Sequence, residues 1–304
     1  MKTTPGLFYA LLLLLAFGAC KKSSSDLPPN QPAGNVLDSL NSILDTASAG
    51  MQVSYPKNAL TGCFPSPLYG DSVIYPQPTS GSDYVVSPVI DPGAGHYLAW
   101  PAGLVIDSLS GAIDITKSQT GQRYAIGYVK NGSKDTCLST IIIGGADYAD
   151  SIYVLANGES VAVPIFNANV NMVSVCDRSG GSNHCSFDLT NSAGSKNLVI
   201  DDKTGEIDLA KSLNGTNNKP GLFGSNPQNG AIVSATIVYS IKTGSNNAVQ
   251  SMDVDLVYYD SKSNVNATLS ATIQERLNNI LLGNLISFNV NPRPPLIVIV
   301  RRLY

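Results

Sequence analysis

Four cysteines in the body of the chain carry the clearest chemistry in this sequence. They are Cys63, Cys137, Cys176 and Cys185. An even number of cysteines is typical of an exported protein with disulfides. Four cysteines allow three pairings, and we favour Cys63–Cys137 and Cys176–Cys185, because the second pair closes a short glycine-containing loop. Each bridge would stabilise the fold by about 2–4 kcal/mol.

Groups for acid–base or metal chemistry are few. The chain has 2 His, which are His96 in a turn-rich loop and His184 beside Cys185. A zinc site needs several Cys or His at set spacings, and His184 with Cys185 does not supply them. We find no nucleophile elbow, phosphate loop or zinc-protease motif. We therefore expect no cofactor, no metal and no enzyme, although an unrecognised pair of carboxylates in a hydrolase stays open.

Cys20 differs from the other cysteines because it directly follows an apolar N-terminal segment. Lys2 precedes an apolar run from Leu7 to Phe17, which is too short to span a membrane, and small residues lead to Cys20. This pattern resembles a lipoprotein signal of the Bacteroidota type, in which Cys20 receives the lipid. The resemblance implies a signal peptide over residues 1–19 and a lipid anchor in the outer membrane, with the chain displayed at the cell surface. The alternative is an ordinary secretory leader.

Composition limits the fold and the partners. The 304 residues have a formal charge of −3, which disfavours nucleic-acid binding through phosphate contacts. With 27 Gly, 18 Pro and 13% charged residues, the sequence favours β-structure. Residues 20–50 form a polar tether with a possible short helix. The remaining length fits two domains, which we place at 51–147 and 148–304.

A sequence repeat divides the rest of the chain. Residues 104–118 (LVIDSLSGAIDITKS) and 198–212 (LVIDDKTGEIDLAKS) share nine of fifteen positions at an offset of 94. In each copy an Asp, Asp107 or Asp201, would accept backbone N–H bonds at the start of a turn. A Gly, Gly111 or Gly205, would then adopt a positive φ. The repeat predicts one hairpin used twice, with Asp114 and Asp208 as further turn or strand positions.

The same motif resembles the strand–turn–strand element of cadherin-like and bacterial immunoglobulin-like domains. The resemblance covers about 30 residues per copy. It implies an all-β protein of two tandem immunoglobulin-like β-sandwiches. Calcium is not implied, because the acidic motifs with which cadherins bind it are missing from the sequence.

Three further segments show clear periodicity. Residues 231–241 and 251–258 alternate as strands, with Asp253 and Asp255 on a solvent-facing side. Residues 272–282 predict an amphipathic helix, and 296–300 a final strand. We expect the helix and the final strand to be appended to the second sandwich.

These features predict a non-catalytic surface lipoprotein of the outer membrane, held there by its N-terminal lipid. Its ligand would be a glycan or another envelope protein, and nucleic acid is not expected. The alternative is a periplasmic spacer or scaffold. Exposed aromatic rings would favour sugar binding, whereas a broad apolar patch would favour a protein partner.

Overall fold

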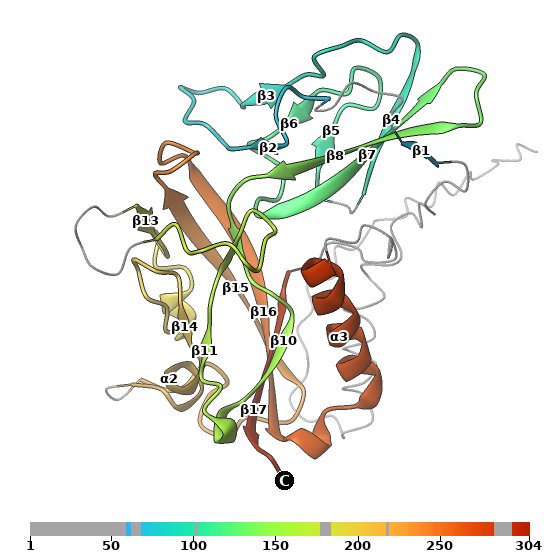
Figure 1. Cartoon of the computed structure of the whole chain (residues 1–304). Coiled ribbons are helices and arrows are strands. Elements are labelled where there is room, and N and C mark those ends of the chain that lie inside the picture. Colours follow the sequence, from blue (N-terminus) through green and yellow to red (C-terminus); the bar gives the residue numbers. More distant parts are fainter. Residues whose placement is uncertain (1–58, 62–67, 101–102, 177–183, 217–218, 283–293) are drawn as a thin grey trace, which may run out of the picture. The chain divides into compact units, whose positions relative to one another are not determined.

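The computed structural model describes residues 59–61, 68–100, 103–176, 184–216, 219–282 and 294–304 (Figure 1). All of them belong to one compact unit, Val36–Tyr304. They are mostly β-strands in several sheets with few helices, so the prediction of a β-rich fold is confirmed. The predicted signal peptide at 1–19, the tether at 20–50, Cys20 and Cys63 lie outside the described residues.

The N-terminal half of the described chain is built on a five-stranded sheet. Strands β7 (Gln122–Lys130) and β8 (Thr136–Ile143) form an antiparallel hairpin, and β4 (Gly95–Trp100) pairs with the other edge of β7. Two short strands, β1 (Ala59–Thr61) and β2 (Val73–Ile74), pair in parallel with β8. His96 therefore lies on strand β4, which corrects its predicted place in a loop.

A three-stranded sheet completes this half. It contains β3 (Val85–Val86), β6 (Ile113–Asp114) and β5 (Val105–Ile106), with β6 in the middle. Buried side chains from this half form one hydrophobic core. Among them are Tyr97, Ile113, Tyr124, Ile126, Ile141 and Ile143. We call this cluster the first core.

The C-terminal half is built on a second five-stranded sheet in the order β10-β17-β16-β15-β13. The strands are β10 (Ser151–Val154), β13 (Cys185–Ser186), β15 (Ala231–Ile241), β16 (Val249–Ser261) and β17 (Leu296–Arg302). Two small antiparallel pairs accompany it, β9 (Ala146–Asp147) with β12 (Ile165–Phe166) and β11 (Val161–Ala162) with β14 (Ile207–Asp208). The α-helices that the structure describes in this half are α2 (Leu209–Asn214) and α3 (Ala267–Leu282).

Strand β17 is an interior strand of the second sheet rather than an appendage. It pairs in parallel with β10 on one side and with β16 on the other. Residues Leu296 to Val300 are all buried, as the unbroken apolar run of a strand covered on both faces requires. The expectation of an appended strand is therefore wrong, because periodicity identifies a strand but does not identify its neighbours.

Two further cores lie on opposite faces of the second sheet. On one face, Ile237, Val254 and Ile299 join the large second core, and on the other Val257 and Val298 pack with Leu269 and Ile273 of α3. Figure 1 shows α3 running beside β17. On the same sheet Asp255 is buried, with 5% of its surface exposed, and accepts a hydrogen bond from Ser234 Oγ. This finding corrects the expectation that Asp255 faces solvent.

A buried ion pair connects α3 to the sheet. Arg276 Nη1 lies 2.7 Å from Asp150 Oδ1, and both side chains are less than 10% exposed. The same Asp150 oxygen accepts a hydrogen bond from the Leu296 N–H at 2.9 Å, where β17 begins. One carboxylate therefore positions both the helix and the start of the interior strand.

Candidate functional site

The repeated turn has the predicted geometry in its first copy. Asp107 Oδ1 accepts hydrogen bonds from the N–H groups of Leu109 and Ser110, and the Gly111 N–H donates to the Asp107 carbonyl. Gly111 has a φ of 70°. A Cβ on Gly111 would lie 2.6 Å from the ring of Tyr97, so a side chain is excluded by space as well as by conformation.

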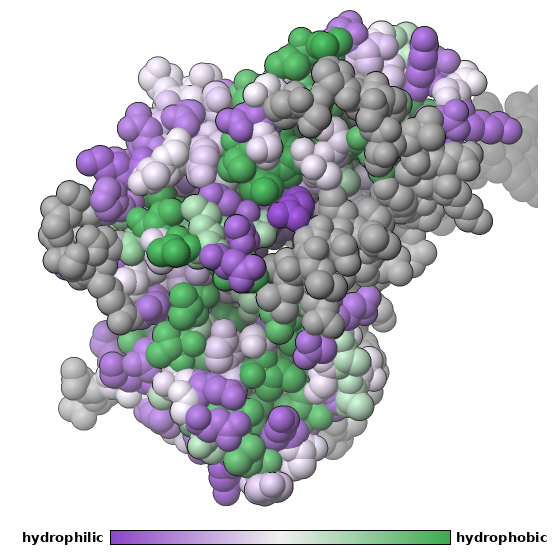
Figure 2. Space-filling model, viewed as in Figure 1, coloured by the Kyte–Doolittle hydropathy of each residue, from purple (hydrophilic) through white to green (hydrophobic). Residues whose placement is uncertain are grey.

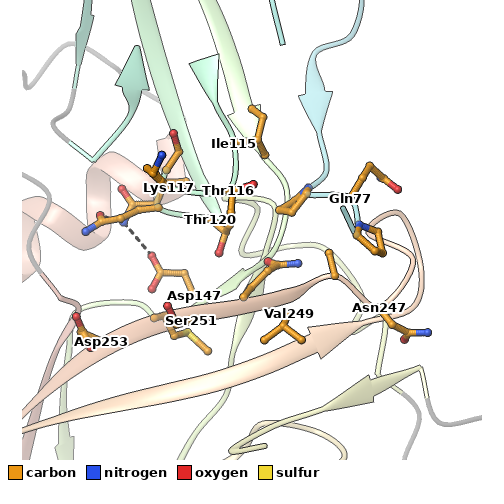
Figure 3. A pocket seen from close by; sticks show the side chains of 18 of the residues that line it. Gln77, Ile115, Thr116, Lys117, Thr120, Asp147, Asn247, Val249, Ser251 and Asp253 are labelled. Carbon is orange, nitrogen blue, oxygen red and sulfur yellow. Dashed lines mark hydrogen bonds between the residues drawn. The ribbon is translucent and has the colours of Figure 1, made fainter. Parts of the chain in front are cut away.

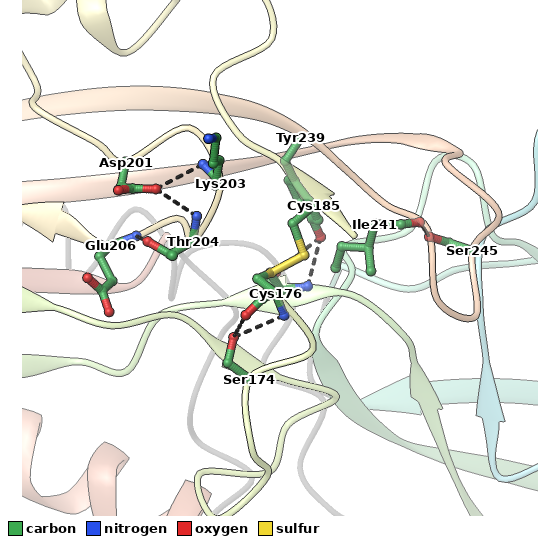
Figure 4. Close-up of a disulfide and its surroundings, with 11 residues drawn as sticks. Ser174, Cys176, Cys185, Asp201, Lys203, Thr204, Glu206, Tyr239, Ile241 and Ser245 are labelled. Carbon is green, nitrogen blue, oxygen red and sulfur yellow. Dashed lines mark hydrogen bonds between the residues drawn. A yellow bond between two sulfur atoms is a disulfide. The ribbon is translucent and has the colours of Figure 1, made fainter. Parts of the chain in front are cut away.

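The second copy repeats these contacts with different neighbours. Asp201 Oδ1 accepts from the N–H groups of Lys203 and Thr204 (Figure 4), and Gly205 has a φ of 74°. A Cβ on Gly205 would lie 2.6 Å from the ring of Phe187. The hydroxyl of Tyr148 donates to the Gly205 carbonyl, as that of Tyr69 donates to the Gly111 carbonyl in the first copy.

The repeat extends beyond the turn. In the first copy Ser118 Oγ donates to the Asp114 carbonyl and accepts from the Val105 N–H. In the second, Ser212 Oγ donates to the Asp208 carbonyl and accepts from the Val199 N–H. The carboxylates of this unit bind backbone N–H groups, and the bonds from Ser110 and Leu109 hold the pKa of Asp107 below its ordinary value. The repeated turn therefore has a structural role.

The cysteines are paired as far as the structure describes them. Cys176 and Cys185 form a disulfide (Figure 4), as predicted. Cys137 is also disulfide-bonded. Its predicted partner Cys63 lies outside the described residues, so that pairing stays a prediction. His184 beside the disulfide has a buried Nδ1 without a hydrogen-bond partner among the described residues.

The best candidate for a functional site is a pocket that no sequence motif indicated. It has a volume of about 470 Å³, within the range of ligand pockets in proteins, ~300–1,000 Å³ (Figure 3). Its walls come from the segments 76–79, 115–122 and 247–253, with Asp147 and two prolines. We call it the seam pocket, because residues from both halves of the described chain line it.

Side-chain amides and hydroxyls dominate the polar lining of the seam pocket. They belong to Gln77, Gln119, Gln122, Asn247, Gln250, Thr79, Thr116, Ser118, Thr120 and Ser251. Among the described residues that line the pocket there is no aromatic side chain, so the exposed rings expected to favour sugar binding are not found here. A ligand would therefore be held by hydrogen bonds and by small apolar contacts, not by stacking on a ring.

Asp147 is the acidic group with the most altered proton affinity in this pocket. Burial raises its pKa to about 7, and the nearby Asp150 carboxylate acts in the same direction. The Tyr148 N–H donates to Asp147 Oδ1 at 2.8 Å, and Gln122 Nε2 lies 3.4 Å from Oδ2. Asp253 also lines the pocket. A carboxyl with this pKa can accept or donate a hydrogen bond near neutral pH.

Tyr239 connects the pocket to the rest of the fold. Its hydroxyl lies 2.6 Å from Thr120 Oγ1, 3.0 Å from the Ala146 nitrogen and 2.8 Å from Gln250 Oε1. Gln250 is 6% exposed and lines the pocket, and its Nε2 has no hydrogen-bond partner among the described residues. One end of the Gln250 amide therefore has no hydrogen-bond partner among the described residues.

Two classes of site find no support in the described part of the chain. Within it, no group of three or more His, Cys, Asp or Glu residues could hold a metal ion. None of the helices described is both long and apolar enough to cross a membrane. Figure 2 shows hydrophobic residues in several small groups among hydrophilic ones on the face that it draws.

Comparisons with known proteins add little to this picture. No protein-family model matches the chain, and no curated protein matches it. The solved structures that match include the extracellular domain of protocadherin GammaB4, at 12% identity and a TM-score of 0.19. That match covers 68% of this chain and 32% of the protocadherin chain, so this chain spans about a third of its length.

Proposed function

We propose that the chain is a non-catalytic surface lipoprotein of the outer membrane that binds a glycan in the seam pocket. The observation that carries the binding role is the pocket lining, in which amide and hydroxyl side chains line a space of about 470 Å³. Sugars present many hydroxyls, and amide side chains can donate and accept hydrogen bonds with them. The leader motif at Cys20 supports the location.

The proposed architecture is a pair of immunoglobulin-like sandwiches behind a lipid-anchored tether. The duplicated turn supports it, since each copy places the same Asp and Gly contacts beside its own hydrophobic core. The proposed limits are 51–147 and 148–304. A periplasmic scaffold is the competing function, and the hydrogen bonds of Tyr239 between distant parts of the chain favour it.

The binding role is tested by screening the purified full chain against a glycan array and by titration calorimetry on each hit. Gln122→Ala should weaken binding at least several-fold, because Gln122 lines the pocket and contacts Asp147. Asn157→Ala is the matched control, an exposed amide outside the pocket lining. No binding to any glycan, or equal binding by the two variants, would overturn the proposal.

The location is tested separately by protease treatment of intact cells and detection with an antibody. Loss of the signal without lysis is the outcome expected of a surface lipoprotein. Protection until the cells are lysed would contradict surface display and favour the scaffold function.

A further inference from the structure

The two five-stranded sheets differ in the strand that pairs with the second arm of their hairpin. In the first sheet, β8 pairs in parallel with β1 and β2, which both precede it in the sequence. In the second sheet, β16 pairs in parallel with β17, which follows it, and β10 lies on the far side of β17. Among the described strands, none that follows β8 pairs with β8.

Two tyrosines show that β10 corresponds to β2. Tyr69 lies four residues before β2, and Tyr148 lies three residues before β10. Each hydroxyl donates to the carbonyl of the turn glycine of its own copy, Gly111 or Gly205. β2 pairs directly with β8, whereas β10 is separated from β16 by β17. β17 is therefore an addition to the repeated unit, inserted between two of its strands.

The place that β17 fills selects an extended apolar segment. Its residues Leu296–Val300 alternate between two cores, with Ile297 and Ile299 in the second core and the others in the core beneath α3. At the start of the strand, the Leu296 N–H donates to the buried Asp150 carboxylate that pairs with Arg276. The direction and register of the inserted strand are thereby defined.

A second copy of the chain contains the segment that fits this place. All contacts of β17 with β10, β16 and α3 would be the same if the strand came from another copy, and exchange of an identical element is a low-cost route to dimers. The chain length allows this exchange. At ~3.3–3.6 Å per residue, the 13 residues between Leu282 and Leu296 reach at most about 45 Å.

We propose that β17 is an exchangeable strand and that the place between β10 and β16 is a binding site for the β17 of a second copy of this chain. The site joins two copies through main-chain hydrogen bonds on both sides of one strand, with alternate side chains entering two cores. This inference is independent of the proposed glycan binding.

Single cysteines on the two sides of the β16–β17 pairing test the proposal. Ser261 and Arg302 are partners in the register of these parallel strands. Neighbouring strands lie ~4.8 Å apart, within the ~4.4–6.8 Å that separates the Cα atoms of a disulfide. Full chains with Ser261→Cys are mixed with full chains with Arg302→Cys, unfolded together in guanidinium at pH 5, refolded at increasing protein concentrations and then oxidised.

A 261–302 disulfide in this mixture can only join two chains, because each chain has one of the two cysteines. We expect its yield, measured by peptide mapping of the covalent dimers, to rise with the protein concentration. A parallel mixture replaces Ser261→Cys by Lys203→Cys, at an exposed position of the repeated turn. The 203–302 disulfide reports random collision and should form at least about five-fold less.

The double variant Ser261→Cys/Arg302→Cys is the second control. It should close the same disulfide within one chain, which shows that the substitutions preserve the register and which locks β17 in its own sheet. The locked chain should stay monomeric by light scattering under the refolding conditions that give dimers of the unaltered chain. If the double variant does not close, Ser151→Cys and Ile297→Cys, partners across β10 and β17, repeat the comparison.

Two results would overturn the proposal. One is an equal yield of the 261–302 and 203–302 disulfides at every concentration while the double variant closes its own disulfide. The other is the same amount of dimer in the locked chain as in the unaltered chain. Either result would make β17 a strand of its own chain alone, and neither bears on the glycan measurements.

Discussion

The hydroxyl groups of Tyr239 and Thr120 lie 2.6 Å apart although 119 residues separate them in the sequence. Tyr239 belongs to β15 of the second sheet, and Thr120 precedes β7 of the first. The Tyr239 side chain is fully buried, and its hydroxyl also binds Ala146 and Gln250. The four groups form a polar cluster inside otherwise apolar surroundings.

Removing this hydroxyl should destabilise the protein. Tyr239→Phe leaves buried partners on Thr120, Ala146 and Gln250 without one bond each, which costs about 1–3 kcal/mol. Tyr259→Phe is the control, since Tyr259 is also buried but its hydroxyl has no hydrogen bond among the described residues. Urea unfolding measures both variants. Equal free energies of unfolding for the two variants would contradict the prediction that the polar cluster stabilises the fold.

The two turn glycines should be intolerant of even a methyl group. Alanine at Gly132 adds only the strain of a positive φ, about 1 kcal/mol, because no other group lies within 4 Å of the place that its Cβ would take. Gly111→Ala and Gly205→Ala add a contact of 2.6 Å with an aromatic ring, and such overpacking costs about 1–3 kcal/mol more. Thermal unfolding of the three variants compares them. A Gly132→Ala variant as unstable as the other two would show that the rings give way.

Stability should fall as the pH rises from about 4 to 7, through the titration of Asp147. Burial raises the pKa of this carboxyl to about 7 in the folded protein, whereas the unfolded chain loses the proton near its ordinary value of 3.8. Between these values the folded state binds more protons, so the free energy of unfolding decreases with pH and levels off above 7.

Asp147→Asn isolates this contribution from that of the other acidic groups. The unfolding free energy of the variant, measured at pH 5 and pH 8, should depend less on pH than that of the unaltered chain. An identical pH dependence would assign the effect to other groups.

Breaking the buried ion pair of α3 should cost more than breaking an exposed one. Arg276→Met leaves the Asp150 carboxylate buried without its cation, and such changes cost about 3–5 kcal/mol. Lys117→Met is the control, because Lys117 pairs with Asp114 at 2.9 Å but is well exposed to solvent. Exposed ion pairs contribute little to the free energy of unfolding. Unfolding in guanidinium measures the free energy of unfolding of both variants. Similar decreases in the two would mean that the Arg276–Asp150 pair is exposed to water.

The parts of the fold that could be predicted from the sequence are those that local contacts determine. Asp107 and Gly111, four residues apart, contain the whole geometry of their turn, so the turn is predictable without knowledge of the tertiary structure. The strand predicted at 231–241 has the bounds of β15, because one of its faces is buried and alternation is clear.

The remaining features depend on residues that are distant in the sequence. Asp255 alternates with apolar residues as a solvent-facing position would, but it is buried in the folded protein. The seam pocket joins Gln122, Asp147 and Gln250, and no spacing in the sequence connects these residues.

The interior position of β17 also means that the second sheet cannot be completed without the last strand of the chain. Asp150 meets Leu296 at a separation of 146 residues, and β10 then pairs along β17. The second sheet therefore cannot be completed before the last residues of the chain are available. The first core needs no residue beyond 143, so it can form before the second sheet. Until β17 pairs, the edges of β10 and β16 stay open to wrong partners.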